Sequence, residues 1–247
     1  MKKKNAFTLA EVLITLGIIG IVAALTLPAL IQKQQKQILI TQIKSTYSIL
    51  YEALNRAKAD YGDFKYWSYN DENLTGAENS WNWSNKYLVH YIKNVKLYNK
   101  STLDGCNNIT YKMPGGTVAS CSSVIGFCGT CNSAQGNMMT QIHLPNGAIV
   151  LVLLRRMYNE AGEYIPVAEF HFDVNGYKGP NVWGKDIFRT QLYKTCKPSD
   201  KNDYVLGYNA CAGNRNNYLN ECNSNNIYRC FDLLQADGFE FKKDYPW

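Results

Sequence analysis

The sequence has few of the residue patterns that carry enzymatic chemistry. Only three histidines occur among its 247 residues: His90, His143 and His171. No His-Glu-x-x-His zinc motif, Gly-rich phosphate-binding loop or nucleophile elbow accompanies them. Internal repeats, low-complexity linkers and blocks of like charge within the body of the chain are also missing. We therefore expect a protein that is not an enzyme.

Charged residues are missing from residues 12–31, whereas Lys2, Lys3 and Lys4 stand close before them. A helix of this length spans about 30 Å, the thickness of the hydrocarbon core of a bilayer. By the positive-inside rule the lysines stay in the cytoplasm, so the rest of the chain lies outside as a single-pass protein. A signal peptide would place a small-residue cleavage site after a shorter apolar run, but here the small residue Ala6 precedes the run.

The stretch from Ala6 to Glu11, followed at once by the apolar run, resembles the type IV prepilin family, which includes the pseudopilins of type II secretion. The resemblance covers residues 2 to about 31. It implies that a prepilin peptidase cleaves between Ala6 and Phe7 and that the new amino group of Phe7 is methylated. Most members of the family have Gly before the cleavage site, so Ala6 departs from the pattern.

Glu11 matches the acidic residue at the fifth mature position of the family. An ionisable side chain at the edge of a membrane helix is costly unless it meets water or a partner. The resemblance implies that Glu11 meets the amino terminus of a neighbouring subunit, in a filament built with other pilin subunits on an inner-membrane assembly platform. Contact with lipid headgroups is the alternative. Pro28 predicts either a kink or, as in pilin filaments, a locally melted helix.

We expect four segments: a leader at 1–6, a membrane and filament-core helix at 7–31, an amphipathic second half of the same helix at 32–62, and a globular head at 63–247. Apolar residues at spacings of three and four support the second half, and Gly62 is a candidate C-cap. The formal net charge of +6 includes the three lysines of the leader. The remaining excess is too small to indicate a nucleic-acid partner by itself.

Cysteine is missing from the leader and from the apolar run. All eight cysteines lie in the part expected outside, where an even number indicates structural disulfides of open connectivity. Two of them form a Cys-x-x-Cys pair, for which redox chemistry and zinc are alternatives, but no βαβ context or second ligand pair supports either. The eight are Cys106, Cys121, Cys128, Cys131, Cys196, Cys211, Cys222 and Cys230.

The pattern of the head predicts an α+β fold, in which the pilin-like long N-terminal helix packs on an antiparallel β-sheet and disulfides staple the head. Asn146-Gly147 marks a tight hairpin turn. Ser84 is the expected N-cap of a second helix. The expected elements are helices at 84–97 and 227–236, short strands at 109–113 and 117–119, a hairpin of 139–144 with 148–154, and a third strand at 167–173.

Aromatic and amide residues dominate residues 63–83. We favour an interpretation in which they pin an irregular loop to the core, and a sugar-binding face is the alternative. The terminal aromatic residues predict a tail packed on the head.

Two function hypotheses follow: a structural subunit of a type IV pilus or type II secretion filament, and a minor pilin that acts as an adhesin or binds DNA during uptake.

Asp173, Asn175 and Asp186 follow the third expected strand, with glycines between them. In some pseudopilins an acidic loop near this place binds calcium, and oxygen ligands around a sharp bend suit Ca²⁺. Calcium takes about six to eight oxygens, however, and only two of these three side chains are charged. A loop braced by Asx-type turns needs the same residues, and we favour that interpretation.

Overall fold

The computed structural model describes residues 8–69, 71, 73–98, 110–118, 139–158, 164–194, 204–207, 214–223 and 229–246. The chain divides into two compact units, residues 1–38 and 39–247, and the longest helix, α1, belongs to both. The helices are α1 (Leu9–Tyr61), η1 (Phe64–Tyr66), α2 (Gly76–Tyr87), η2 (Val89–Tyr91), α3 (Arg215–Asn223) and α4 (Cys230–Ala236). The strands are β1 (Lys96–Tyr98), β2 (Met139–His143), β3 (Ile149–Tyr158), β4 (Tyr164–Asp173), β5 (Ile187–Lys194) and β6 (Tyr204–Leu206).

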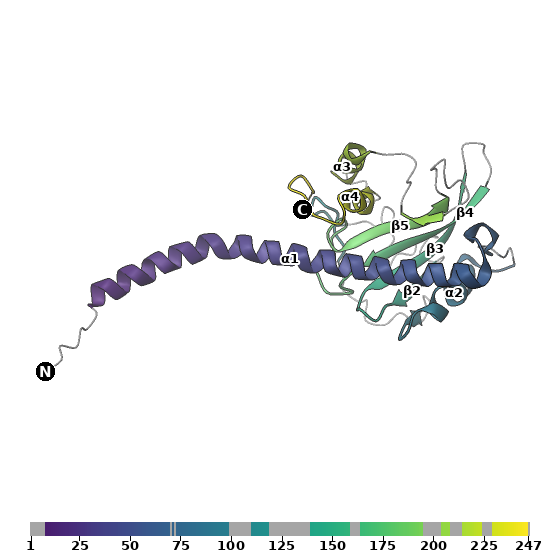
Figure 1. Ribbon diagram of the computed structural model, residues 1–247, viewed down its shortest axis with the longest axis horizontal. Coiled ribbons are helices and arrows are strands. Elements are labelled where there is room, and N and C mark those ends of the chain that lie inside the picture. Colours follow the sequence, from purple (N-terminus) through teal and green to yellow (C-terminus); the bar gives the residue numbers. More distant parts are fainter. Residues whose placement is uncertain are drawn as a thin grey trace. The chain divides into compact units, whose positions relative to one another are not determined.

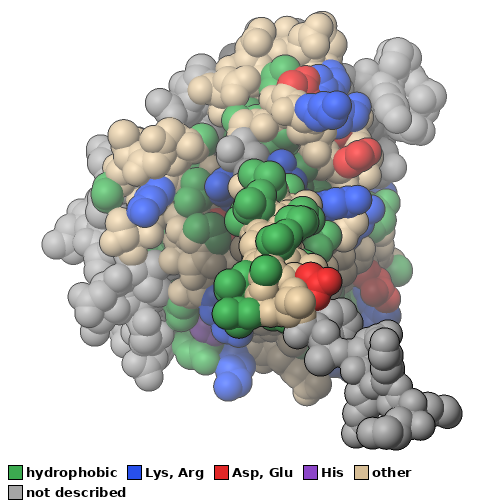
Figure 2. All heavy atoms as spheres, turned by 90° about the vertical axis from the view of Figure 1, so that its left-hand side faces the viewer, with side chains coloured by type: hydrophobic (Ala, Val, Ile, Leu, Met, Phe, Trp, Pro, Cys, Tyr) green, Lys and Arg blue, Asp and Glu red, His purple; other side chains and the backbone are tan. Residues whose placement is uncertain are grey.

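The first unit is the N-terminal half of α1. Its large apolar side chains are exposed, by between 43% at Val12 and 79% at Leu9. Figure 2 shows hydrophobic side chains gathered on this part of the helix. The helix is continuous through Pro28. A helix that leaves its apolar side chains uncovered needs lipid or other helices around it.

The second unit is an α+β head, as expected. Its antiparallel sheet has the order β1-β2-β3-β4-β5-β6, and each strand pairs with the next one along the chain. The C-terminal half of α1 buries Ile43, Leu50 and Leu54 in the same core cluster as Phe170 and Phe172 of β4. Figure 1 shows this part of α1 running along the sheet, with α3 and α4 close together. Gly62, at φ 77°, follows the end of α1 as the predicted C-cap.

The predicted hairpin is confirmed. Strands β2 and β3 pair from Met139 with Leu153 to His143 with Ile149. Gly147 takes φ 89° in the turn, and the side-chain oxygen of Asn146 accepts a hydrogen bond from the backbone of Ala148 at 3.1 Å. The third predicted strand is confirmed as β4, which begins three residues earlier than expected.

The second helix was placed wrongly by the sequence analysis. Helix α2 ends at Tyr87, and its N-cap is Thr75, which forms a capping box with Glu78. Ser84 is buried inside this helix and does not begin it. The apolar residues after Tyr87 lie in the turn η2, in strand β1 and in the connections beside them, so their helical spacing was coincidental.

The sheet is larger than the three strands expected. Strands β1, β5 and β6 extend it at both edges, and α3 lies in a segment for which no element was expected. The predicted terminal helix is confirmed as α4, which begins at Cys230. Of the two short strands expected at 109–113 and 117–119, the described residues show an isolated bridge between Lys112 and Val118.

Candidate functional site

Helix α1 begins with a capping box made by Thr8 and Glu11. The backbone N–H and the hydroxyl of Thr8 each donate to the carboxylate of Glu11 at 2.8 Å. In return, the backbone N–H of Glu11 donates to the hydroxyl oxygen of Thr8 at 3.2 Å. Such a box satisfies donors that the first turn of a helix leaves open. The carboxylate of Glu11 is thus occupied within its own chain. Ala6 and Phe7, the predicted processing residues, lie outside the described residues.

Threonine hydroxyls along the apolar half of α1 donate hydrogen bonds to backbone carbonyls of the same helix. The hydroxyls of Thr15 and Thr26 donate to the carbonyls of Val12 and Val22, at 3.0 and 2.9 Å. Hydroxyls satisfied in this way are tolerated in lipid. Pro28 has no N–H to give the preceding turn, so one carbonyl loses its helical partner there. By length and composition, α1 is the one helix within the described part of the chain that is able to cross a membrane.

The acidic loop between β4 and β5 is organised by two carboxylates. Asp186 accepts hydrogen bonds from the backbone N–H groups of Asn181, at 2.8 Å, and of Val182, at 2.6 Å. The side-chain amide of Asn175 also donates to it, at 3.3 Å. Asp173 accepts the backbone N–H of Asn175 at 3.2 Å. The structure therefore brings together the three residues that the sequence analysis singled out, and most of their bonds are those of a loop brace.

The same loop also holds oxygens without a hydrogen-bond partner among the described residues. These are one carboxylate oxygen of Asp173 and the side-chain oxygens of Asn175 and Asn181. Burial, followed by the charge of Asp186, raises the pKa of Asp173 to about 8. These oxygens could serve as ligands of a hard cation such as Ca²⁺. The described residues contain no group of three or more His, Cys, Asp or Glu side chains in reach of one metal ion.

A second buried set of charges lies on the sheet. Glu169 of β4 contacts His171, at 2.5 Å, and forms an ion pair with Arg189 of β5. Arg155 of β3 lies 3.3 Å from the same carboxylate. Burial by itself would raise the pKa of Glu169, but His171, Arg189 and Arg155 together lower it to about 2. Matched charges of this kind hold neighbouring strands together, and we interpret the cluster as structural.

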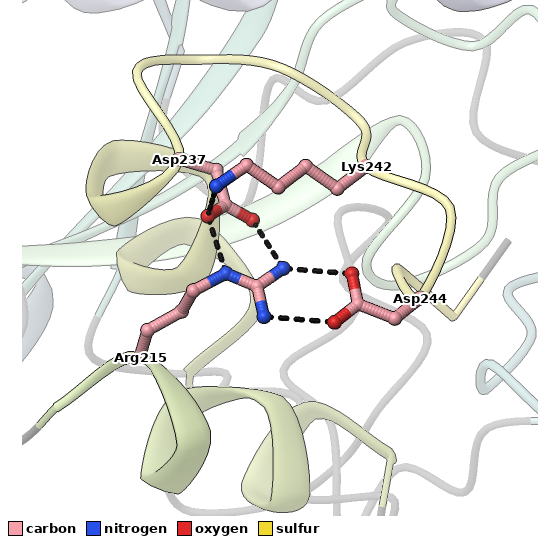
Figure 3. Close-up of polar contacts among 4 residues, drawn as sticks. All are labelled: Arg215, Asp237, Lys242 and Asp244. Carbon is pink, nitrogen blue, oxygen red and sulfur yellow. Dashed lines mark hydrogen bonds and ion pairs between the residues drawn. The ribbon is translucent and has the colours of Figure 1, made fainter.

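The C-terminal part is tied together by a disulfide and by an ion-pair cluster. Cys222 of α3 and Cys230 of α4 form a disulfide. Arg215 makes paired hydrogen bonds to Asp237, at 2.5 and 2.9 Å, and to Asp244, at 2.8 and 2.7 Å. Figure 3 shows the guanidinium between the two carboxylates, with Lys242 reaching Asp237 from the other side. The other six cysteines lie outside the described residues.

The terminal tail packs on the head, as the sequence analysis expected. Tyr245 is 4% exposed, and its hydroxyl donates to the backbone carbonyl of Gly184 at 2.6 Å. Gly184 takes φ 81°, and a side chain there would meet the sulfur of Cys230 at 3.0 Å. The tail, the disulfide and the acidic loop therefore form one packed region.

The aromatic segment after α1 is mainly core. Trp67 stacks on Tyr87 with ring centres 4.0 Å apart, and Trp83 lies against both rings. All three are at most 5% exposed, so their faces are closed to a ligand. Tyr66 is exposed, at 74%, and Trp81 is half-buried.

Two features of the site were missed by the sequence analysis. The first is Thr8 as the partner of Glu11, although Thr-x-x-Glu before an apolar run is a readable capping-box pattern. The second is Arg215, whose partners are 22 and 29 residues away in the sequence. No local pattern indicates contacts of that range.

Comparison with known proteins gives two family matches. The prokaryotic N-terminal methylation motif matches residues 1–27. A family of unknown function, DUF6613, matches residues 29–247. No curated protein and no solved structure matches the chain significantly.

Proposed function

Because the chain belongs to the family of unknown function DUF6613 and is a type IV prepilin-like protein, we propose that it is a structural subunit of a type IV pilus or of a type II secretion pseudopilus. The methylation motif and the apolar N-terminal helix fit a pilin or pseudopilin anchored in the membrane. The motif also implies processing by a prepilin peptidase and assembly with other pilin subunits. We propose cleavage between Ala6 and Phe7, with methylation of Phe7.

The observation that carries this proposal is the uncovered N-terminal half of α1. Its apolar side chains contribute nothing to the core of the head, which begins at Leu39. Lipid tails are as apolar as the side chains of this helix, so the helix exchanges lipid for other helices at little net loss. In the proposed mechanism the helix rests first in the membrane and then in the filament core among copies of itself. The head stays on the outer side throughout.

In the proposal, Glu11 favours the transfer of the helix from the membrane into the filament. Before assembly, Thr8 supplies two donors to the carboxylate, which lowers the cost of keeping it near lipid. After leader removal, the amino group of Phe7 on a neighbouring subunit offers a full positive charge, and a charge-assisted bond is about twice as strong as a neutral one. Glu11 then passes from Thr8 to the neighbour and sets the register of the two helices.

Chemical identification of the mature N-terminus tests the proposal. The protein purified from the membranes of the cells that make it should begin at N-methylated Phe7, as read from the mass of its N-terminal peptide. In cells without a prepilin peptidase it should begin before Ala6 and should be missing from sheared filaments. A peptide that begins at Met1 in cells with an active peptidase would contradict the proposal.

The second candidate function is that of a minor pilin that binds a glycan or DNA. The exposed ring of Tyr66, with the ammonium of Lys65 4.7 Å from its centre, favours it as a small aromatic and basic surface. Salt-sensitive retention of DNA, or glycan binding lost in Trp81→Ala or Tyr66→Ala, would support this function. Equal retention by the wild type and the Tyr66→Ala variant would exclude the surface at Tyr66.

A further inference from the structure

We propose that Asn73 is an acceptor site for an N-linked oligosaccharide. Asn73-Leu74-Thr75 is an Asn-x-Thr sequence, the acceptor pattern of N-glycosylation. The proposal rests on the proposed function in one respect, because the head must lie on the outer side of the membrane.

The fold presents Asn73 on a surface turn. The backbone N–H of Leu74 donates to the carbonyl of Asp71 at 3.1 Å and closes the turn between η1 and α2. Asn73 and Thr75 are both exposed. The backbone N–H and the side-chain amide of Asn73 both donate to the carboxylate of Asp71, at 3.0 Å each. The amide nitrogen is thus held at the surface, before the first turn of the helix.

The chain carries another acceptor sequence, of the form Asn-x-Ser, which serves as an internal comparison. Asn82-Trp83-Ser84 lies inside α2, where Trp83 is 2% exposed and Ser84 is fully buried. A transferase must hold the hydroxyl residue as well as the asparagine, so this sequence is closed in the folded head. Two further sequences of this kind occur in the chain. The one at 99–101 lies wholly outside the described residues, and the one at 108–110 lies partly outside them.

The reaction needs a polyprenyl-diphosphate-linked oligosaccharide as the donor. The side-chain nitrogen of Asn73 forms a bond to C1 of the first sugar, and the bond from C1 to the diphosphate oxygen breaks. The diphosphate leaves with the electron pair, and the amide proton passes to a base of the transferase. No oxidant or reductant takes part.

Thr75 has two roles, and they can be separated. Its hydroxyl caps α2 by bonding the backbone N–H of Glu78, and it also donates to the carboxylate of Glu78. Serine at this position keeps both the cap and the acceptor sequence. Aspartate is an equally good N-cap, but Asn-x-Asp is not an acceptor sequence. Thr75→Asp therefore removes the sequence while it keeps the helix start.

Peptide mass spectrometry of the full-length protein from the cells that make it tests the proposal. Digestion with trypsin and then after glutamate separates Asn73 from Asn82, because Glu78 lies between them. We expect a hexose- or N-acetylhexosamine-containing mass on the peptide with Asn73. That mass should persist in Thr75→Ser and Asn82→Gln and should disappear in Asn73→Gln and Thr75→Asp.

Two outcomes would overturn the proposal: an unmodified Asn73 peptide in the wild type, or a sugar mass that persists in Thr75→Asp. The same digest, run without reduction, reports the disulfide between Cys222 and Cys230. A disulfide without sugar would reject the acceptor site alone, since the head has then reached an oxidising compartment. Free thiols without sugar would reject the outer location of the head as well.

Discussion

The carboxylates of Asp173 and Asp186 share one buried loop, and only Asp186 is fully supplied with hydrogen-bond donors. Asp186 is bonded by two backbone N–H groups and one side-chain amide. Asp173 keeps one oxygen without a partner among the described residues, and its pKa is raised to about 8 by burial and by the charge of Asp186. Asp173 is therefore protonated at neutral pH in the folded head.

This raised pKa makes the stability of the head depend on pH. In the unfolded chain an aspartate loses its proton near pH ~4, whereas folded Asp173 holds it to about pH 8. Between these two pH values the folded state binds one more proton than the unfolded chain. The free energy of unfolding is therefore greatest at the acid end of the interval and falls as the pH rises, by up to about 1.4 kcal/mol per pH unit. Asp173→Asn should flatten this slope and be the more stable protein at pH ~8.

Urea unfolding of the full chain in detergent, from pH ~5 to ~8.5, measures the slope. Glu240→Gln is the control, because Glu240 is an exposed carboxylate of the head. It should retain the slope of the wild type. Parallel curves for Asp173→Asn and the wild type would show that Asp173 does not carry the effect.

Calcium addition separates the two interpretations of the acidic loop. A bound Ca²⁺ would stabilise the folded state by mass action, and more strongly at higher pH as Asp173 loses its proton. We expect the loop brace, because backbone N–H groups already occupy Asp186 and one oxygen of Asp173. The melting temperature should then be equal in millimolar calcium and in chelator. A rise in calcium that Asp173→Ala abolishes would establish the metal site instead.

Arg215 should be the most sensitive position of the C-terminal region. Its removal leaves the carboxylate of Asp237, whose side chain is fully buried, with Lys242 as its remaining cation within the cluster of Figure 3. We expect Arg215→Ala to lower the free energy of unfolding, because it takes one of the two cations from a buried carboxylate. Arg56→Ala breaks an exposed pair with Glu52 and should cost less than about 0.5 kcal/mol. If urea unfolding showed the same loss of unfolding free energy in Arg215→Ala and Arg56→Ala, the ion-pair cluster would not hold the tail.

The sequence predicted those parts of the structure in which local pattern and tertiary burial agree. The long helix, the Asn146-Gly147 hairpin and strand β4 all have a regular apolar period or a specific turn residue. Strand β5 lacks this agreement, because its three central residues, Arg189, Thr190 and Gln191, are polar although all three are buried. A run of polar residues does not indicate a buried strand, so no strand was expected there.

Helix α3 and the C-terminal ion pairs depend on contacts between distant residues. The helix is polar, and a disulfide and Arg215 hold it in place; neither leaves a periodic signal. In the candidate site, the three loop residues were found because short polar side chains with glycines mark a turn. The aromatic residues of 63–83 pack mainly in the core, as expected, but residues 76–83 belong to helix α2 and not to an irregular loop. The processing residues Ala6 and Phe7 and the role of Glu11 stay predictions.

Assembly should depend on the charge of Glu11 and much less on its hydrogen bonds to Thr8. Glu11→Val removes both the capping box and the partner of the neighbouring amino terminus. We expect it to lower incorporation into sheared filaments at least about tenfold. Thr8→Val keeps the carboxylate but removes the hydroxyl that caps it. It should leave incorporation within about threefold, because a cap contributes about 1 kcal/mol to the free subunit and nothing after transfer to a neighbour.

Quantitative immunoblots of sheared and membrane fractions measure the partition of each variant. Glu52→Gln is the matched control, since it neutralises an exposed carboxylate of α1 outside the apolar half. A single-pass membrane protein that never polymerises would show the same partition in Glu11→Val, Thr8→Val and the control. A loss in Thr8→Val as large as that in Glu11→Val would mean that the capping box itself, and not the transfer of the charge, is what assembly requires.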